Sequence, residues 1–335
     1  MQNLLDPAIL FFLVGVLAGL VKSSLEIPPA ISRFLSLYLL MALGLKGGFA
    51  LSQSGLTADV GVSLAAAMGL AISIPLAGYW VLRHFVSGFD AAAVAATYGS
   101  VSAVTFVTAV QFLDHQGIAY GGHMAAAMAL MESPAIIIAV IFASRLRHGA
   151  VAPTQPQPDE QGAPHAPGAV APPSVTRILH ESFTDGAQLL LLGAMVVGII
   201  TGDAGKTAMQ PFSGDLFKGM LSFFLLDMGL MAARNLPQVQ GKSPVLIAYA
   251  VLGPIAHAGV ALALASFLGL SVGDGCLLMV LAASASYIAV PAVLRFALPE
   301  ANPSLYFGLS LGVTFPLNIL VGIPTYASLA RHVLG

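Results

Sequence analysis

The chain has 335 residues, of which 57% are hydrophobic and only 8% are charged, and its formal net charge is −2. A soluble domain carries about 25% charged residues, so this chain cannot cover itself with a surface that faces water. The sequence also lacks a basic cluster, which argues against nucleic-acid binding. A single cysteine, Cys276, excludes an intramolecular disulfide and a multi-cysteine metal site.

Apolar runs long enough to cross a bilayer recur along the chain. A hydrocarbon core about 30 Å thick needs about 20 residues of helix. The predicted fold class is therefore an all-α integral membrane protein with about ten transmembrane helices. In chain order these helices are predicted at residues 7–21, 31–51, 59–83, 91–113, 121–145, 184–202, 212–233, 243–269, 275–298 and 304–330.

A segment rich in proline and alanine separates the fifth predicted helix from the sixth. Such a composition cannot bury a core, so residues 148–176 are predicted to form a solvated linker. The linker divides the chain into a first five-helix repeat, residues 1–147, and a second, residues 177–335.

Lysine and arginine residues are concentrated on the side of the linker, and such residues favour the cytoplasmic side of a membrane. The bias predicts a multi-pass protein of the inner membrane with a cytoplasmic linker and both termini outside. The linker side carries Lys22, Arg33, Arg83, Arg145, Arg147, Arg177, Arg234, Lys242 and Arg295; the other side carries Lys46, Lys206, Lys218 and Arg331.

Three pairs of motifs, all offset by about 185 residues, indicate an internal repeat. The second and seventh helices share a pattern in which Gly44 matches Gly229. The fourth and ninth helices share cores of small residues, and the fifth and tenth share mid-span prolines, Pro134 and Pro316. Because five is an odd number, the second repeat inserts upside down. Such inverted repeats are typical of secondary transporters, whose site lies near the midplane at the repeat interface.

Small and hydroxyl side chains gather at the middle of the fourth and ninth helices, where Ser100 lies about 15 Å deep. Such residues permit a helix break, and two half-helices starting here would direct N–H groups and positive dipole ends at one cavity that favours a small anion. The alternative is that small residues only permit close helix packing. The candidate substrate-binding residues are Gly99, Ser100, Ser102, Thr105, Ser284, Ser286 and Tyr287.

Glu132 lies at mid-depth in the fifth helix. A carboxylate there is costly, so it marks an ion or proton pathway. Together with Ser102 and Thr314 it forms a candidate Na⁺ site, the alternative being a protonated Glu132 that bonds a neighbouring helix. Among other deep polar residues, Asp227 is as consistent with packing or a pairing with Lys46 as with function. His257 is predicted to be a hydrogen-bonded interior histidine rather than a ligand. Asn318 is predicted to cap a helix or to line the cavity.

These motifs together resemble the sodium-dependent bicarbonate transporter family of the cyanobacterial type, over essentially the whole chain apart from the linker. The resemblance implies core and gate subdomains, a homotrimer, and Na⁺-coupled import of bicarbonate by an elevator-type motion. No docking motif for a cytoplasmic regulatory protein is recognisable, so that partner is not predicted. The matching pieces include GLKGGFAL (44–51), YGSVSAVTF (98–106), MESPA (131–135), AASASYIAVPAVLR (282–295) and ANPSLYFG (301–308).

The chain departs from the family pattern at several positions of the site. Tyr287, Ala289 and Val290 stand where the family pattern has acidic and small polar residues, and Glu132 stands where it has aspartate. Fewer hydroxyl groups leave fewer donors for a hydrated oxyanion. A cation- or proton-coupled carrier of a different small carboxylate therefore remains an alternative.

Two further classes of protein are disfavoured. An intramembrane enzyme lacks support because neither H-E-x-x-H nor G-x-S-x-G occurs in the sequence. A channel is disfavoured because inverted repeats with interrupted helices suit alternating access.

Overall fold

The computed structural model describes residues 6–55, 57–150, 186–239 and 243–335. Within these ranges the chain forms helices and no strand. Most of the predicted linker lies outside the described residues, although helix α6 continues to Ala150. An all-helical fold is the expected solution for a chain in lipid, because each helix satisfies its own backbone hydrogen bonds.

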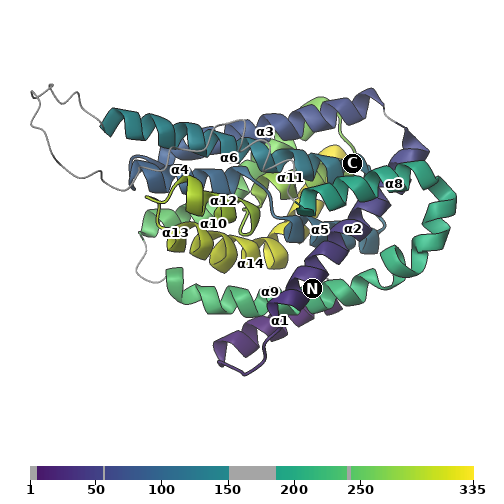
Figure 1. The fold of residues 1–335 in the computed structure, drawn as a ribbon. Coiled ribbons are helices and arrows are strands. Elements are labelled where there is room, and N and C mark those ends of the chain that lie inside the picture. The colour runs from purple at the N-terminus through teal and green to yellow at the C-terminus, as the bar shows by residue number, and fades with distance from the viewer. Residues whose placement is uncertain (1–5, 56, 151–185, 240–242) are drawn as a thin grey trace, which may run out of the picture.

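Fourteen α-helices make up the described part of the chain, and short π-helical or 3-10 segments extend some of them (Figure 1). The short segments are Gln210–Asp215, Leu236–Val239, Ser310–Thr314 and Asn318–Gly322. The α-helices are α1 (Pro7–Leu20), α2 (Pro29–Ser54), α3 (Ala58–Leu82), α4 (Gly88–Gly99), α5 (Ala103–Gln116), α6 (His123–Ala150), α8 (Gly186–Met209), α9 (Phe217–Asn235), α10 (Pro244–Leu268), α11 (Val272–Ala283), α12 (Ala289–Ala297), α13 (Pro303–Leu309), α14 (Phe315–Leu317) and α15 (Ile323–Leu334).

Side chains from the preceding turn start several of these helices. The hydroxyl of Ser87 accepts a hydrogen bond from the amide of Asp90 at the start of α4, and Ser271 does the same for Asp274 at the start of α11, both at 3.1 Å. Each hydroxyl satisfies one of the N–H groups that lack a partner in the first turn of a helix. The motif Ser-x-x-Asp therefore sets the start of both helices.

Helices α1, α2, α8 and α9 form one group, the panel, in which α1 packs along α9 and α2 packs along α8 (Figure 1). Two glycines allow this close packing. A Cβ atom on Gly44 would lie 2.3 Å from the carbonyl oxygen of Leu191, and one on Gly229 would lie 2.2 Å from that of Phe12. No side chain fits at either position, because a Cβ atom there would overlap the backbone of the facing helix.

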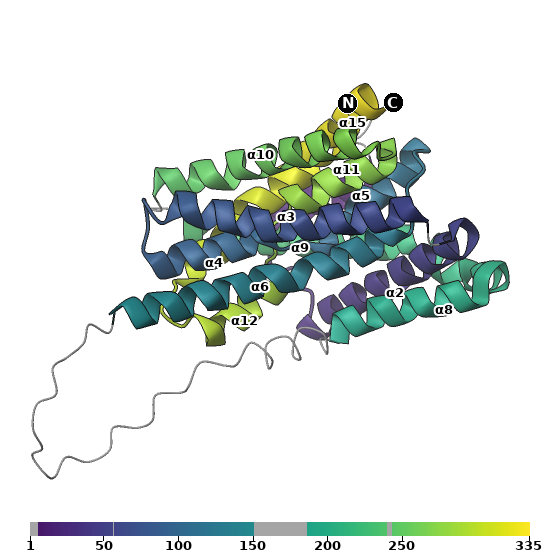
Figure 2. The ribbon, with the colours of Figure 1, turned by 90° about the horizontal axis from the view of Figure 1, so that it is seen from above.

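The remaining helices form a second group, the bundle, in which α3 packs on α4 and α6, and α11 packs on α10 and α15. Figure 2 shows α2 and α8 side by side at one edge, next to the stacked helices of the bundle. Buried apolar side chains of both groups join in one large core cluster. The panel and the bundle thus meet along an interface that includes contacts of α2 and α8 with α6.

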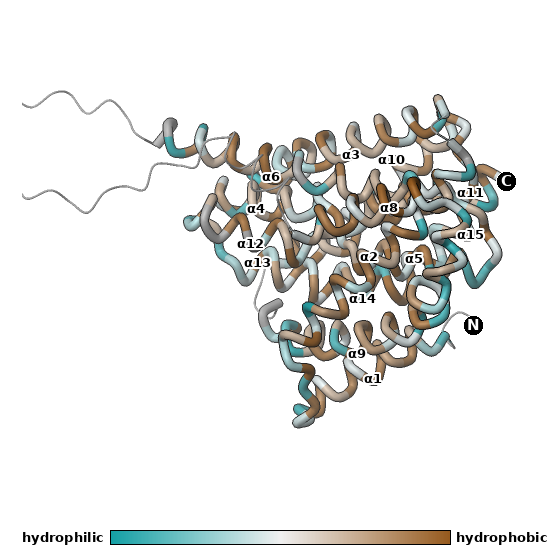
Figure 3. Tube along the Cα trace, turned by 45° about the vertical axis from the view of Figure 1, so that its right-hand side comes forward, coloured by the Kyte–Doolittle hydropathy of each residue, from teal (hydrophilic) through white to brown (hydrophobic). Residues whose placement is uncertain are grey.

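The outer surface of the helices is strongly apolar, as expected for contact with lipid. Phe267 is 87% exposed and Ile200 is 77% exposed, both on helices whose other faces are buried. Figure 3 shows hydrophilic residues gathered mostly at the two ends of the helical stack and hydrophobic residues between them. The chain is accordingly a multi-pass membrane protein.

Within the described residues, seven helices are long and apolar enough to cross a membrane. One of them, Gly186–Asn235, is 50 residues long and contains both the sixth and the seventh predicted spans. It bends at Gly202, whose φ of +52° is a backbone conformation that glycine adopts without strain. Two further apolar helices, Pro7–Leu20 and Val272–Ala283, are shorter than the length required. The helix lengths thus differ from the ten predicted spans at these places.

Candidate functional site

Two helices of the bundle are interrupted at the positions that the sequence indicates. Helix α4 ends at Gly99 and α5 begins at Ala103, with Ser100 extended between them. Helix α11 ends at Ala283 and α12 begins at Ala289, with Ser284 extended at the break. Small side chains and serine hydroxyls make both interruptions possible, because serine can bond to nearby backbone groups outside a helix.

The two interruptions cross and hydrogen-bond to each other. The amide of Ser102 donates to Oγ of Ser284 at 3.0 Å, and the amide of Ser286 donates to the carbonyl of Thr97 at 2.8 Å. Oγ of Ser284 in turn donates to the carbonyl of Leu281 at 2.9 Å. Backbone groups that the breaks release from helical bonding therefore find partners in the opposite interruption.

A polar side chain from a neighbouring helix satisfies a carbonyl at the end of α11. The side-chain amide of Asn318 donates to the carbonyl of Ala283 at 2.8 Å and accepts from the hydroxyl of Tyr326 at 3.1 Å. Asn318 thus caps the end of the broken helix. The Nδ1 atom of His257 is buried without a hydrogen-bond partner in the described ranges, so the prediction of a hydrogen-bonded interior histidine stays a prediction.

A cavity of about 260 Å³ adjoins this crossing and lies between the bundle and the panel. Four of the predicted site residues line it: Ser102, Glu132, Ser286 and Tyr287. The bundle contributes most of the wall and the panel contributes five residues. The lining is Ser36, Leu40, Val101, Ser102, Ala103, Val104, Met128, Ala129, Glu132, Ile136, Ala187, Gln188, Leu191, Ser286, Tyr287, Ile288, Ala289 and Val293.

The other predicted site residues lie behind the wall of the cavity. Gly99 packs against the ring of Pro75, and the Ser100 hydroxyl is buried without a hydrogen-bond partner in the described ranges. Thr105 and Ser284 are buried in the crossing itself, where Thr105 Oγ1 lies 2.9 Å from Ser102 Oγ. These residues support the interruptions and do not line the cavity.

Thr314 is also placed away from the cavity. Its hydroxyl donates to the carbonyl of Ala250 at 2.7 Å and lies 2.6 Å from the hydroxyl of Tyr98. Of the three candidate Na⁺ ligands, the structure brings Ser102 and Glu132 to one cavity and does not bring Thr314 there.

Glu132 is the one charged side chain among the residues that line the cavity. Its Oε2 accepts a hydrogen bond from the side-chain amide of Gln188, at 2.5 Å. Gln188 comes from the start of α8 and is buried, and sequence reasoning missed it. The signal for it is weak, because a single uncharged amide at the end of an apolar run is common in membrane helices.

Two helix starts adjoin the same space. Ala103 and Val104 open α5, Ile288 precedes α12 and Ala289 opens it, and all four residues line the cavity. The first N–H groups of a helix have no partner within it and carry the positive end of the helix dipole. The cavity therefore combines a carboxylate that suits a cation with helix starts that suit an anion.

Tyr287 closes one side of the cavity toward the panel. Its ring packs edge-on against Phe315 at 5.2 Å between centroids, and its hydroxyl lies 3.7 Å from the sulfur of Met228 on α9. Only 4% of Tyr287 is exposed, so it presents to the cavity a small part of a large buried ring. Asp227, the neighbour of Met228, bonds the hydroxyl of Ser32 and does not line the cavity.

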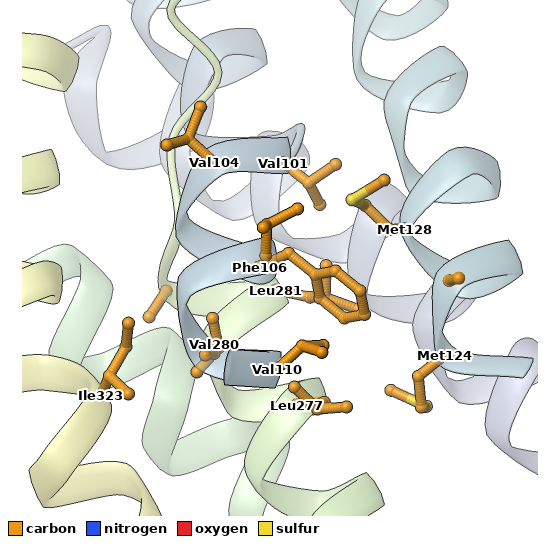
Figure 4. Packing of buried hydrophobic residues seen from close by; sticks show 14 of the residues in the cluster. Val101, Val104, Phe106, Val110, Met124, Met128, Leu277, Val280, Leu281 and Ile323 are labelled. Carbon is orange, nitrogen blue, oxygen red and sulfur yellow. The ribbon is translucent and has the colours of Figure 1, made fainter. Parts of the chain in front are cut away.

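The cavity lies toward the helix ends that flank the linker. Ala187 and Gln188 are the second and third residues of α8, and Ile136 is at the middle of α6. On the opposite side the space between α5, α6 and α11 is filled by apolar side chains, which Figure 4 shows packed together. These are Phe106, Val110, Met124, Leu277 and Leu281.

Figure 4 also shows Val101 and Met128, two residues of the cavity wall, beside this apolar cluster. The cluster therefore separates the cavity from the side of the protein away from the linker. The cavity is therefore a mostly apolar pocket with a few polar groups, and apolar side chains block one of its sides.

In a comparison with known families, the model of the Na⁺-dependent bicarbonate transporter superfamily matches residues 7–331, almost the whole chain. A comparison with curated proteins gives no significant match.

Proposed function

Since the chain belongs to the Na⁺-dependent bicarbonate transporter superfamily, we propose that it is a symporter that uses Na⁺ to import bicarbonate or a closely related small anion. The observation that carries the proposal is the cavity at the two crossed interruptions, which holds one carboxylate and two helix starts. Glu132 would bind the cation with help from the Ser102 hydroxyl, and the first N–H groups of α5 and α12 would bind the anion.

Energetics favour such coupling. Moving one monoanion into a cell against an inside-negative potential costs about 2.3 kcal/mol per 100 mV. A co-transported cation cancels this cost, and its gradient or a second cation supplies the drive. A cavity that accepts both charges side by side meets this requirement.

The proposed architecture is ten membrane crossings in two inverted five-helix repeats. Hydrogen bonds related by the repeat support it. Asp90 at the start of α4 accepts from the amide of Asn302, just before α13, at 2.8 Å. Asp274 at the start of α11 accepts from the amide of Gly121, just before α6, at 2.6 Å. In each case the fourth helix of one repeat holds the beginning of the fifth helix of the other.

The packing of the panel supports the same relation. Gly44 on the second helix of the first repeat contacts α8, the first helix of the second repeat. Gly229, which matches Gly44 in sequence, contacts α1, the first helix of the first repeat. Two matching glycines thus make matching contacts between the repeats.

We propose that transport proceeds by an elevator-type motion of the bundle, as the core subdomain, against the panel, as the gate. The cavity at their interface supports this, because sliding one group past the other would carry the site from one side to the other. With the linker in the cytoplasm of the cell and both termini outside, the present cavity faces inward.

The family resemblance further suggests a homotrimer, which light scattering of the purified protein tests.

The test of the proposed function is uptake of radiolabelled bicarbonate into proteoliposomes with an imposed Na⁺ gradient. We expect uptake to require Na⁺ and to fall sharply in Glu132→Gln and in Ser102→Ala. Asp203→Asn is the matched control, because Asp203 is a carboxylate of α8 that bonds Gln53 outside the cavity. Bicarbonate uptake that is the same with and without Na⁺ would contradict the proposal.

A second candidate cargo is a small organic carboxylate. Twelve of the 18 lining residues are apolar, among them Leu40, Ile136 and Val293. The Ser102 and Ser286 hydroxyls already accept hydrogen bonds from the amides of Thr105 and Val290. An anion with an apolar body would use such walls better than a fully hydrated one. A thermal-shift screen of anions, with and without Na⁺, distinguishes the two cargoes.

A further inference from the structure

Gln188 connects the panel to the bundle inside the cavity. It lies on α8 of the panel, is 7% exposed, and donates its side-chain amide to Oε2 of Glu132 on α6 of the bundle. Any sliding of the bundle against the panel separates these two side chains. The hydrogen bond therefore belongs to the conformation in which the cavity faces the linker.

An amide hydrogen and a cation compete for the same oxygen atoms. A carboxylate has about four lone-pair sites, and each N–H that occupies one reduces what is left for a cation. Hydrogen bonds to a charged group are also stronger than neutral ones, because the negative charge attracts the donor. The Gln188 amide therefore competes with a cation for the Oε2 atom of Glu132 in this conformation.

We propose that Gln188 promotes release of the co-transported Na⁺ on the linker side, by donating its amide to the Glu132 carboxylate in place of the ion. The proposal rests on the proposed function, in which Glu132 binds Na⁺. When the bundle slides, Glu132 leaves Gln188 behind and its oxygens become available again. One residue of the panel thus makes the ion site weak on the inner side and strong on the outer side, which favours import.

The experiment measures Na⁺ binding through thermal stability, and needs no cargo. Purified protein in detergent is heated at increasing NaCl, with choline chloride holding the ionic strength constant. A ligand that binds the folded state raises the melting temperature in proportion to the logarithm of its concentration relative to Kd. In Gln188→Met, which keeps the length of the side chain and removes the donor, we expect the apparent Kd for Na⁺ to fall about tenfold, the loss of one charge-assisted hydrogen bond.

Gln53→Met is the matched control. The side-chain amide of Gln53 donates to Asp203 at 2.6 Å, between α2 and α8 of the same panel, and neither residue lines the cavity. Its apparent Kd for Na⁺ should equal that of the wild type. If Gln188→Met is too unstable to titrate, Gln188→Asn replaces it, because its side chain is one carbon shorter and holds the donor farther from Glu132. Its apparent Kd for Na⁺ should lie between that of the wild type and the tenfold lower value expected for Gln188→Met.

The outcomes separate the two proposals. An unchanged Kd in both Gln188→Met and Gln188→Asn would overturn the release role and leave Na⁺ coupling intact. If Na⁺ stabilises neither the wild type nor Gln188→Met, Na⁺ coupling itself is overturned, and the release role with it. A lower Kd for Na⁺ in the Gln188 variants supports both the release role and Na⁺ coupling, provided that adding Glu132→Gln to these variants abolishes the stabilisation by Na⁺.

Discussion

Replacing Ser284 by alanine tests whether the crossing of the two interruptions stabilises the fold. Oγ of Ser284 accepts from the amide of Ser102 at 3.0 Å and donates to the carbonyl of Leu281 at 2.9 Å, and Ser284 is 1% exposed. Alanine leaves the Ser102 amide buried without this partner. The carbonyl of Leu281 keeps a second donor, the backbone amide of Ser284, at 3.3 Å.

The main loss is thus one unsatisfied buried N–H, which costs about 1–3 kcal/mol of the free energy of unfolding. Equilibrium unfolding of Ser284→Ala and wild type in mixed micelles measures the difference. Ser222→Ala is the matched control, because the Ser222 hydroxyl only donates to the carbonyl of Lys218 on its own helix at 2.8 Å. The control should stay within about 0.5 kcal/mol of wild type. If the free energy of unfolding of Ser284→Ala is also within about 0.5 kcal/mol of wild type, the Ser102–Ser284 hydrogen bond does not stabilise the fold measurably and the prediction is wrong.

Two further predictions concern the panel and the loop before α13. Gly229→Ala should destabilise the fold, because its Cβ would meet the Phe12 carbonyl at 2.2 Å, whereas Gly219→Ala on the same helix has open space and should be neutral or stabilising; thermal melts of both compare them. The hydrogen-bonded guanidinium of Arg147 lowers the pKa of Glu300. The pair therefore contributes stability above the unfolded pKa of about 4.3 and loses it as pH falls through the lower folded pKa. Melting temperatures measured from pH 6 to pH 3 should fall less steeply in Glu300→Gln; equal slopes would contradict the assignment.

The sequence predicted the two interruptions because their cause is local. Glycine and serine at 99–102 and serine at 284–286 have low helix propensity, and the breaks occur there. The role of each residue at a break is not local. Ser284 was predicted to bind substrate, yet its hydroxyl serves the Ser102 amide, 182 residues away along the chain. No pattern of spacing reports a partner at that distance.

The candidate cation site shows the same limit. The mid-depth carboxylate of Glu132 was recognisable from its cost in lipid, and it lines the cavity. Thr314 was expected beside it, but the packing of the bundle turns its hydroxyl to Ala250 and Tyr98. Gln188 is beside it because α8 of the panel packs against α6, a contact between helices on either side of the linker.

The sequence by itself determined that this protein lies in lipid, and it determined where two of its helices are interrupted. Both follow from side-chain properties that act locally: too few charges to face water, and small residues that do not sustain a helix. Only the tertiary structure decided which polar groups face the cavity and which form hydrogen bonds that stabilise the two helix interruptions. Every buried donor and acceptor must find a partner, and the partners that settled the outcome come from other helices.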